Sequence, residues 1–229
     1  FAKQGYPARA LFSIPFVGIN EKGNPVCINE KGQATVGDLN FQERDNTDYL
    51  IYEGSTDPIY NGSLGNTFNY KGFHLNLFLT YAFGNVVRLD PVFSAKYNDL
   101  TSMTHDFKNR WMQPGDENVT NVPGVVSRYE YEQNRTLLST AYNAYNYTSV
   151  RTAKGDFIRL KEISLAYDFP HRWLENSPVN NISLKLQATN LMLLYADKKL
   201  NGQDPEFMNA GGVASPMPKQ FTLTLKLGL

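Results

Sequence analysis

The chain has almost no cysteine, no excess of charge of either sign and no long apolar run. Cys27 is the single cysteine among 229 residues, so no internal disulfide can form, and no histidine or cysteine stands near it to suggest a metal or nucleophile role. The formal net charge is zero, which leaves no basic surplus for binding nucleic acid. The mean hydropathy is −0.41 and no apolar run reaches about 18 residues, which excludes a helical membrane protein.

Histidine is also scarce, and the three histidines do not combine into a catalytic site. His74 falls on the polar side of an alternating segment, His105 in a long polar link, and His171 in a turn between two prolines. The sequence contains neither a phosphate-binding glycine loop nor a nucleophile elbow. We therefore predict no enzyme activity, no cofactor and no metal site.

One pair of carboxylates needs a separate decision. Asp204 and Glu206 flank Pro205 and could form an acid–base pair for glycoside hydrolysis. The other interpretation is a proline-fixed turn in a loop, with Asp204 capping the turn. We favour the turn.

What the chain does contain is strict alternation at its C-terminal end. In residues 221–229, each odd-numbered residue is Phe or Leu and each even-numbered one is Thr, Lys or Gly. Side chains alternate across a strand, so this segment has one apolar and one polar face. Aromatic residues, at 13% of the chain, favour strands and also form the girdles of membrane barrels. An amphipathic strand about nine residues long fits a transmembrane β-barrel better than most soluble sheets.

Five more segments alternate in the same way. They are residues 8–17, 59–70, 72–83, 157–169 and 182–194. Within residues 157–169, Ile158 and Leu160 are out of phase with the apolar residues that follow. This phase change predicts either a β-bulge near Lys161 and Glu162 or the point at which the strand leaves the membrane.

The connections between these segments alternate between short and long. Residues 70–73 predict a tight hairpin and residues 170–181 a modest turn, whereas the links 18–58, 84–156 and 195–220 are long and polar. Soluble domains rarely carry structureless loops of that length, but outer-membrane barrels have short periplasmic turns and long extracellular loops. If residues 221–229 run inward, every short turn falls on the periplasmic side and every long loop outside.

About six strands cannot close a membrane barrel, since eight is the usual minimum. Open sheet edges in lipid are prohibitive, so the remainder of the barrel must come from more of the same polypeptide. The first residues also look like the interior of a larger protein. We therefore expect residues 1–229 to be the C-terminal portion of a transmembrane β-barrel domain, with the fold class all-β and antiparallel.

This interpretation assigns the two faces of each strand to different surroundings. The expected lipid-facing residues are Leu75, Leu77, Leu79, Leu165, Leu184, Leu186, Leu223, Leu225 and Leu227. The expected lumen-facing residues are His74, Asn76, Lys185, Gln187, Thr222, Thr224 and Lys226. The alternative is a soluble β-sandwich that binds carbohydrate and buries the apolar faces between two sheets, which would not explain the pattern of loop lengths. A weaker alternative is an adhesin or receptor barrel that does not transport.

Several motifs resemble one family along nearly the whole chain. They are GSTDPIYNG at 54–62, NTFNYKGF at 66–73, RWMQPGD at 110–116, FIRLKEISLAYDFP at 157–170, Asn190-Leu191 and Asp204-Pro205-Glu206, with Tyr6-Pro7 and Gly18-Ile19-Asn20 near the start. Their order and content resemble the C-terminal part of SusC/RagA-type TonB-dependent outer-membrane transporters of Bacteroidetes. One departure is Leu229, where such barrels commonly end in an aromatic residue.

The resemblance implies a multi-pass outer-membrane protein of about twenty-two strands with an N-terminal plug in the lumen. It implies import of oligosaccharides or peptides together with a SusD-like surface lipoprotein. It also implies that energy comes from the TonB complex through an N-terminal segment. The plug and the first strands are absent from these residues, so this piece would not transport alone. Its remaining expected partners are the lipid bilayer and the rest of its own barrel.

Two groups of side chains are candidates for contact with the substrate or the lipoprotein. Arg110 and Trp111 form either a ligand-contacting ledge or an element that folds the long loop, and we favour loop folding because the motif looks shared among transporters of differing substrate. The second group is a run of tyrosines, whose rings stack on sugars and whose hydroxyls form hydrogen bonds; its alternatives are an aromatic girdle or a lipoprotein-contacting surface. These are Tyr129, Tyr131, Tyr142, Tyr145 and Tyr147.

Overall fold

The computed structural model describes residues 3–90, 104–175, 178–208 and 217–228. The chain divides into two compact units. The helical unit comprises Phe1–Thr56, Val86–Ala153 and Gly211–Val213, and the sheet unit comprises Asp57–Asn85, Lys154–Ala210 and Ala214–Leu229. Each unit is described by itself.

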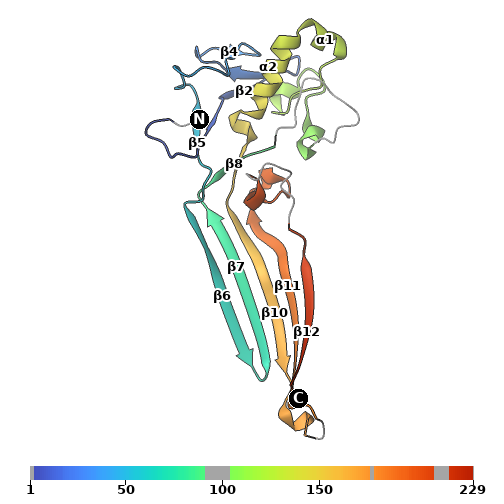
Figure 1. Cartoon of the computed structure of the whole chain (residues 1–229). Coiled ribbons are helices and arrows are strands. Elements are labelled where there is room, and N and C mark those ends of the chain that lie inside the picture. The colour runs from blue at the N-terminus through green and yellow to red at the C-terminus, as the bar shows by residue number, and fades with distance from the viewer. Residues whose placement is uncertain (1–2, 91–103, 176–177, 209–216, 229) are drawn as a thin grey trace. The chain divides into compact units, whose positions relative to one another are not determined.

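The sheet unit is built on a five-stranded antiparallel sheet with the order β12-β11-β10-β7-β6 (Figure 1). The strands are β6 (Tyr60–Tyr70), β7 (Phe73–Phe83), β10 (Phe157–Asp168), β11 (Asn181–Ala196) and β12 (Gln220–Gly228). Five of the predicted strands are therefore confirmed, with boundaries shifted by no more than two residues. Leu229 lies outside the described residues.

The register of the sheet keeps its two faces chemically uniform. One row of paired residues crosses all five strands as Leu223, Leu186, Leu165, Leu75 and Phe68. The next row, on the other face, is Thr222, Gln187, Ser164, Asn76 and Thr67. Paired residues project to the same side, so the two sets of predicted face residues do lie on opposite faces.

The phase change predicted in β10 is a β-bulge. Glu162 pairs with Phe78 and Leu160 with Leu79, so Lys161 is an extra residue on the β10 side of the ladder. The extra residue reverses the alternation, which returns Leu160 to the apolar face.

The apolar face is exposed. Leu223 and Leu225 have exposed fractions of 67% and 59%, and Leu186 has 54%. A β-sandwich requires the opposite, because its second sheet would bury this face. Among the described residues of the sheet unit, no second sheet covers this face, so the sheet unit by itself does not form the sandwich of the alternative interpretation.

The connection between β6 and β7 is the expected tight hairpin. Its two central residues, Lys71 and Gly72, have φ values of 46° and 86°. Positive φ at both positions is the type I′ geometry, whose twist matches that of the flanking strands. The turn after β10 contains the short helix η4 (His171–Trp173).

The prediction for residues 8–17 is wrong. This segment forms two short strands, β1 (Ala10–Ser13) and β2 (Phe16–Ile19), which pair with β5 (Ile51–Ser55) and β3 (Pro25–Ile28) rather than with the large sheet. Pro15 separates them, because proline has no N–H to continue a ladder.

The helical unit contains a small meander whose two turns repeat. Strands β2, β3 and β4 (Ala34–Thr35) are joined by residues 19–24 (INEKGN) and 28–33 (INEKGQ). In each turn the asparagine side chain accepts hydrogen bonds from backbone N–H groups two and four residues later: Asn20 from Lys22 and Asn24, and Asn29 from Lys31 and Gln33. The same local code therefore builds both turns.

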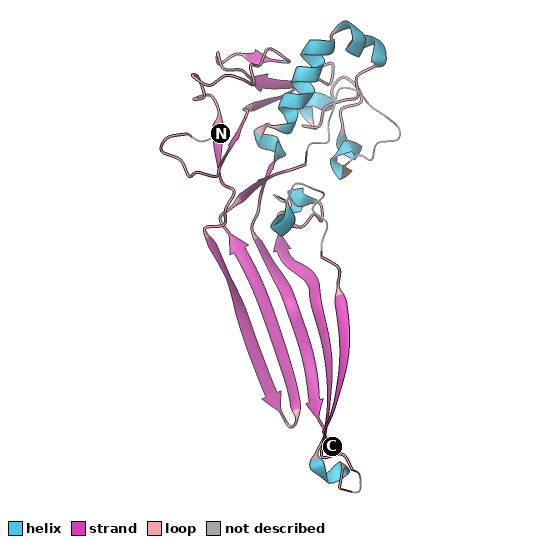
Figure 2. Cartoon of the chain, viewed as in Figure 1, coloured by secondary structure: helices cyan, strands magenta, loops and turns pink. Residues whose placement is uncertain are grey.

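The described residues of the link 84–156, which are 84–90 and 104–156, are not structureless as the sequence suggested. They contain helices α1 (Arg128–Gln133) and α2 (Arg135–Asn146), which appear in cyan in Figure 2. Helix α1 begins at Ser127, whose hydroxyl accepts a hydrogen bond from the N–H of Glu130. Helix α2 buries Leu138, Ala141, Tyr142 and Tyr145 at helical spacing.

Short elements complete the fold. They are β8 (Val86–Arg88), which pairs with β9 (Thr152–Lys154), and the 3₁₀ helices η1 (His105–Asn109), η2 (Asp116–Asn118), η3 (Ser149–Arg151), η5 (Lys198–Leu200) and η6 (Pro205–Phe207). None of the helices in the described ranges is both long and apolar enough to cross a membrane.

Candidate functional site

The polar face of the sheet carries a histidine held on both sides. Nε2 of His74 lies 3.0 Å from a carboxylate oxygen of Asp168, and Nδ1 lies 2.6 Å from the side-chain oxygen of Asn69. The three residues lie at the end of the sheet where the β6–β7 hairpin turns. They make this part of the polar face a hydrogen-bonding surface.

A buried ion pair lies toward the other end of the same face. Arg159 of β10 donates to both carboxylate oxygens of Asp204 at 2.6 Å and lies 3.2 Å from a carboxylate oxygen of Glu206. Asp204 is fully buried and also accepts a hydrogen bond from the N–H of Glu206, which starts η6. The carboxylate of Asp204 therefore caps a turn, as expected. It is not placed to act as one of the two carboxylates of glycoside hydrolysis.

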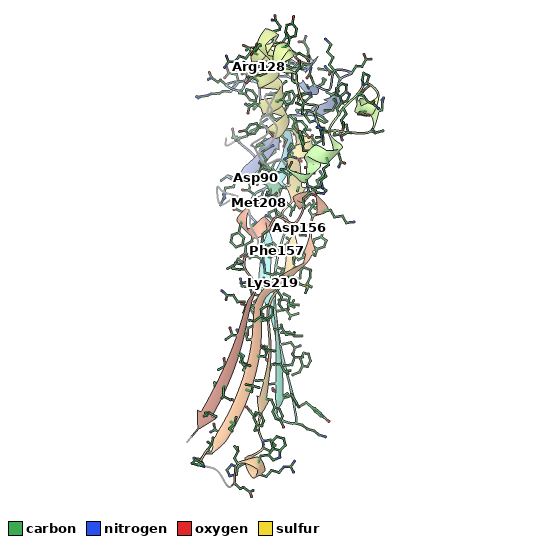
Figure 3. All side chains as sticks on the ribbon, turned by 90° about the vertical axis from the view of Figure 1, so that its right-hand side faces the viewer. Asp90, Arg128, Asp156, Phe157, Met208 and Lys219 are labelled. Carbon is green, nitrogen blue, oxygen red and sulfur yellow. The ribbon has the colours of Figure 1, made fainter. Side chains whose placement is uncertain are left out.

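The ion pair holds the segment that follows β11 against the sheet. Leu200 and Met208 in this segment are buried, and so is Phe157 at the start of β10. Phe157 and Met208 are labelled in Figure 3 near this end of the sheet. The polar face is consequently covered here and open farther along the strands.

In the helical unit, the ring of Trp111 is partly buried and packs against the backbone at Gly23 and Gly124. A Cβ placed on Gly23 would clash with this ring, and one on Gly124 would come within 2.8 Å of it. Its Nε1 donates to Glu117 at 3.0 Å, while the guanidinium of Arg110 lies over the ring of Phe107. Both predicted site residues therefore make contacts with neighbouring parts of the helical unit, and loop folding stays our prediction for them.

Two of the predicted tyrosines are core residues. Tyr142 and Tyr145 are each 2% exposed, and the hydroxyl of Tyr142 donates to the carbonyl oxygen of Gly124 at 2.5 Å. Burial raises the pKa of Tyr142 and raises that of Tyr145 to about 12. Neither ring is available to a ligand in this conformation.

The other three tyrosines reach the surface to different extents. Tyr129 is 77% exposed, and Tyr131 packs partly against the core. Tyr147 is 46% exposed, with its ring edge-on to Phe41 at 6.5 Å and the guanidinium of Arg88 over its face. Of these three, Tyr147 is the one placed beside another exposed aromatic ring.

A cavity of about 810 Å³ in the helical unit was not anticipated from the sequence. It is lined by Lys3, Gln4, Phe41, Gln42, Glu43, Arg44 and Thr47. The lining joins two stretches almost forty residues apart, and no motif marks either. Only the exposed aromatic Phe41 within a polar run could have drawn attention to it.

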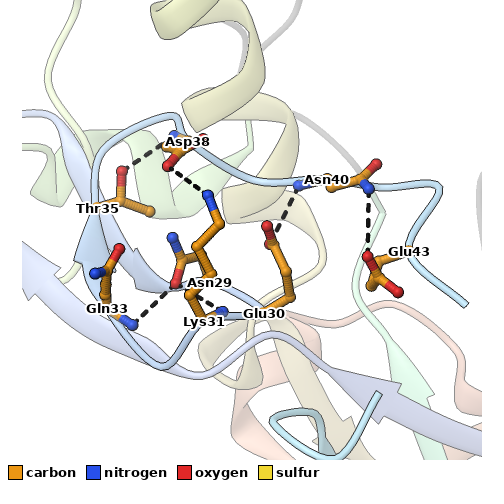
Figure 4. Close-up of polar contacts among 8 residues, drawn as sticks. All are labelled: Asn29, Glu30, Lys31, Gln33, Thr35, Asp38, Asn40 and Glu43. Carbon is orange, nitrogen blue, oxygen red and sulfur yellow. Dashed lines mark hydrogen bonds and ion pairs between the residues drawn. The ribbon is translucent and has the colours of Figure 1, made fainter. Parts of the chain in front are cut away.

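A polar network fixes one rim of this cavity (Figure 4). The N–H of Asn40 donates to Glu30 at 3.4 Å, and the side-chain amide of Asn40 donates to Glu43 at 3.5 Å. Lys31, in the second repeated turn, pairs with Asp38 at 3.6 Å. The rim is thus tied to the turn of residues 28–33.

Two charged groups of the cavity already have partners. The ammonium of Lys3 lies 2.7 Å from Asp48, and this hydrogen bond lowers the pKa of the Asp48 carboxyl. Glu43 accepts hydrogen bonds from the N–H groups of Asn46 and Asp45, which lower its pKa as well. Within the described ranges, no cluster of three or more His, Cys, Asp or Glu side chains could hold a metal ion.

Comparison with solved structures identifies the class of fold. A chain of the RagAB peptide transporter matches 99% of this chain, with a TM-score of 0.66 and 20% identity, and the match covers 23% of that chain. The "closed-closed" state of the RagAB peptide importer matches 94% of this chain with a TM-score of 0.62 and 19% identity, over 22% of that chain. The fold is therefore that of a section of a chain of this transporter.

Comparison of sequences then identifies the relatives. The chain is 27% identical over 192 residues to TonB-dependent receptor P39 of Formosa agariphila, covering 79% of this chain and 17% of that protein. It is 26% identical over 160 residues to TonB-dependent receptor P3 of the same organism, covering 67% and 13%. The predicted resemblance to TonB-dependent transporters is confirmed, and the chain spans about a sixth of these relatives' length or less. No protein-family model matches it.

Proposed function

We propose that this chain is the C-terminal part of the barrel of a TonB-dependent importer in the bacterial outer membrane. The observation that carries the proposal is the sheet with one exposed apolar face and one polar face, maintained in register over five strands. Lipid on the apolar side and a water-filled lumen on the other satisfy both faces at once. The RagAB-like fold and the sequence similarity to TonB-dependent receptors support it.

The two outermost strands support the presence of further strands. Within the described sheet, β6 and β12 each pair on one side only. An unpaired strand edge is too costly in hydrocarbon, so the barrel of about twenty-two strands is completed by preceding parts of the same polypeptide, which also supply the plug and the segment that contacts TonB. The substrate is an oligosaccharide or a peptide, delivered with a SusD-like lipoprotein.

Adjacent residues of β12 provide the test of the two faces. In the complete polypeptide, Thr222→Cys should react with a membrane-impermeant maleimide, whereas Leu223→Cys should react only with a membrane-soluble one. Equal reaction of both positions with the impermeant reagent would contradict the barrel.

Transport itself is tested in cells. Deletion of the complete gene should abolish uptake of its oligosaccharide or peptide, and a protonophore should abolish uptake in the complemented strain, because TonB draws on the inner-membrane proton gradient. Uptake that survives the deletion would contradict an import function. Recovery of the complete protein in the soluble fraction would contradict the location.

A further inference from the structure

The cavity in the helical unit has the volume of a ligand-binding site and a mostly polar lining. Its volume of about 810 Å³ falls within the range of small-molecule sites, which is roughly 300–1,000 Å³. Its lining combines one aromatic ring with amide, hydroxyl and charged groups. One rim is held by the network around Asn40 and Glu43, so the groups on it are partly preorganised.

Some of the polar side chains that line the cavity already have a hydrogen-bond or ion-pair partner in the protein, and others do not. Lys3 is paired with Asp48, and the carboxylate of Glu43 faces backbone N–H groups. In contrast, the guanidinium of Arg44 forms no ion pair with any residue in the described part of the chain. The side-chain amides of Gln4 and Gln42 also lack a hydrogen-bond partner within the described residues.

These unoccupied groups define the chemistry of a ligand. A guanidinium presents a planar pair of donors that matches a carboxylate, and each amide offers both a donor and an acceptor. Phe41, 48% exposed and edge-on to Tyr147, presents an apolar ring face. The matching ligand is a carboxylate next to a ring or an apolar side chain, with amide or hydroxyl groups on either side.

The surrounding charges limit what kind of anion fits. Glu30, Glu43, Asp45 and Asp48 lie in the same stretch of sequence as Arg44, so the region does not attract anions in general. A ligand gains favourable binding free energy only if its carboxylate forms a direct hydrogen-bonded pair with the guanidinium of Arg44.

We propose that this cavity binds an oligomer bearing a carboxylate, with Arg44 paired to the carboxylate, Gln4 and Gln42 to neighbouring polar groups, and Phe41 to an apolar face. The carboxylate can belong to a uronic acid unit of an oligosaccharide or to a peptide. This inference deepens the proposed function, on which it rests, by naming a substrate class.

The test measures binding to the complete purified protein by titration calorimetry. The probes are tetragalacturonate and an acidic tetrapeptide, each with a neutral counterpart of the same length. One acidic probe should bind, and R44Q should weaken it at least tenfold. R44K should weaken it nearly as much, because an ammonium lacks the planar pair of donors. The matched control is R128Q, since Arg128 is an exposed arginine of the same unit that does not line the cavity.

Either acidic probe binding with this pattern supports the site and identifies the source of the carboxylate. Absence of binding by both acidic probes overturns it, and so does an R44Q protein that binds as R128Q does. Weaker binding by F41A, with unchanged thermal unfolding, would support the aromatic contact. Uptake of the same probes by energised cells is measured in parallel. Uptake of a probe whose binding does not depend on Arg44 overturns this inference alone. Absence of uptake of any oligosaccharide or peptide overturns the proposed function.

Discussion

The sheet unit and the helical unit place their apolar side chains in opposite ways. In the sheet unit, Leu223 and Leu225 are 67% and 59% exposed. In the helical unit, Leu138 and Tyr142 are 1% and 2% exposed and form a core. The sheet unit thus presents apolar side chains at its surface, whereas the helical unit packs them into a core.

The difference teaches that exposure alone does not measure how a side chain stabilises a fold. The helical unit gains stability by removing apolar area from water. The sheet unit gains it from backbone ladders and, under the proposed function, from lipid against the apolar face. Replacing an exposed apolar residue by a charged one should therefore destabilise the sheet unit and leave the stability of the helical unit nearly unchanged.

The largest effect is expected from a buried ion pair in the sheet unit. Asp204→Ala should destabilise the protein by about 3–5 kcal/mol, because it leaves the buried guanidinium of Arg159 without its main partner. Asp106→Ala, which removes the carboxylate facing Arg151 in the helical unit, should cost less, since Asp106 is 29% exposed. Urea unfolding of the complete protein in vesicles measures both. Equal losses of unfolding free energy in the two variants would show that the greater burial of the Arg159–Asp204 pair does not make it the more important one.

A somewhat smaller effect should come from the apolar face. Leu223→Arg should cost about 2–4 kcal/mol if the face meets the middle of a bilayer. The control is Val119→Arg, at a valine of the helical unit that is 84% exposed, which should change stability by no more than about 0.5 kcal/mol. The fraction of each variant that folds into membranes is the measurement. A tolerated arginine at 223 would mean that water covers this face.

The contrast also explains what could be predicted from the sequence. The large strands and the bulge at Lys161 follow from alternation, which is a local pattern that survives in any surrounding. Residues 8–17 show the limit of that signal. Their alternation is real, but Pro15 interrupts the ladder and the two halves pair with different strands.

The helical unit was less accessible to prediction because its order depends on distant contacts. The spacing of Leu138, Ala141, Tyr142 and Tyr145 fits one face of a helix, but tyrosine side chains also suit ligand contact, and the sequence alone does not separate the two roles. The cavity could not have been predicted, since residues 3–4 and 41–47 meet only through tertiary folding.

A single hydroxyl in the helical core should have a modest effect. Tyr142→Phe removes the hydrogen bond to the carbonyl oxygen of Gly124 and should cost about 0.5–1.5 kcal/mol. Tyr129→Phe is the matched control, because that tyrosine is 77% exposed. Hydrogen exchange of the α2 amides compares them. If Tyr129→Phe speeds exchange as much as Tyr142→Phe does, the buried hydroxyl is not what stabilises the helix.

The smallest expected effect is a change in the rate at which the single cysteine is alkylated, which reports local unfolding of the helical unit. Cys27 is 1% exposed, and burial raises the pKa of its thiol to about 12, so only about one thiol in ten thousand is ionised at pH 8. Iodoacetamide should therefore modify Cys27 at least about a thousandfold more slowly than the exposed cysteine of a V119C variant, as followed by peptide mass mapping.

Because the thiol ionises near pH 9 in the unfolded chain and near 12 in the folded one, the stability of the helical unit should fall as the pH rises through that interval. Tyr142→Phe should accelerate modification of Cys27 and Leu223→Arg should not, provided that the two units open independently. Acceleration by both would show that the sheet and the helical unit unfold together.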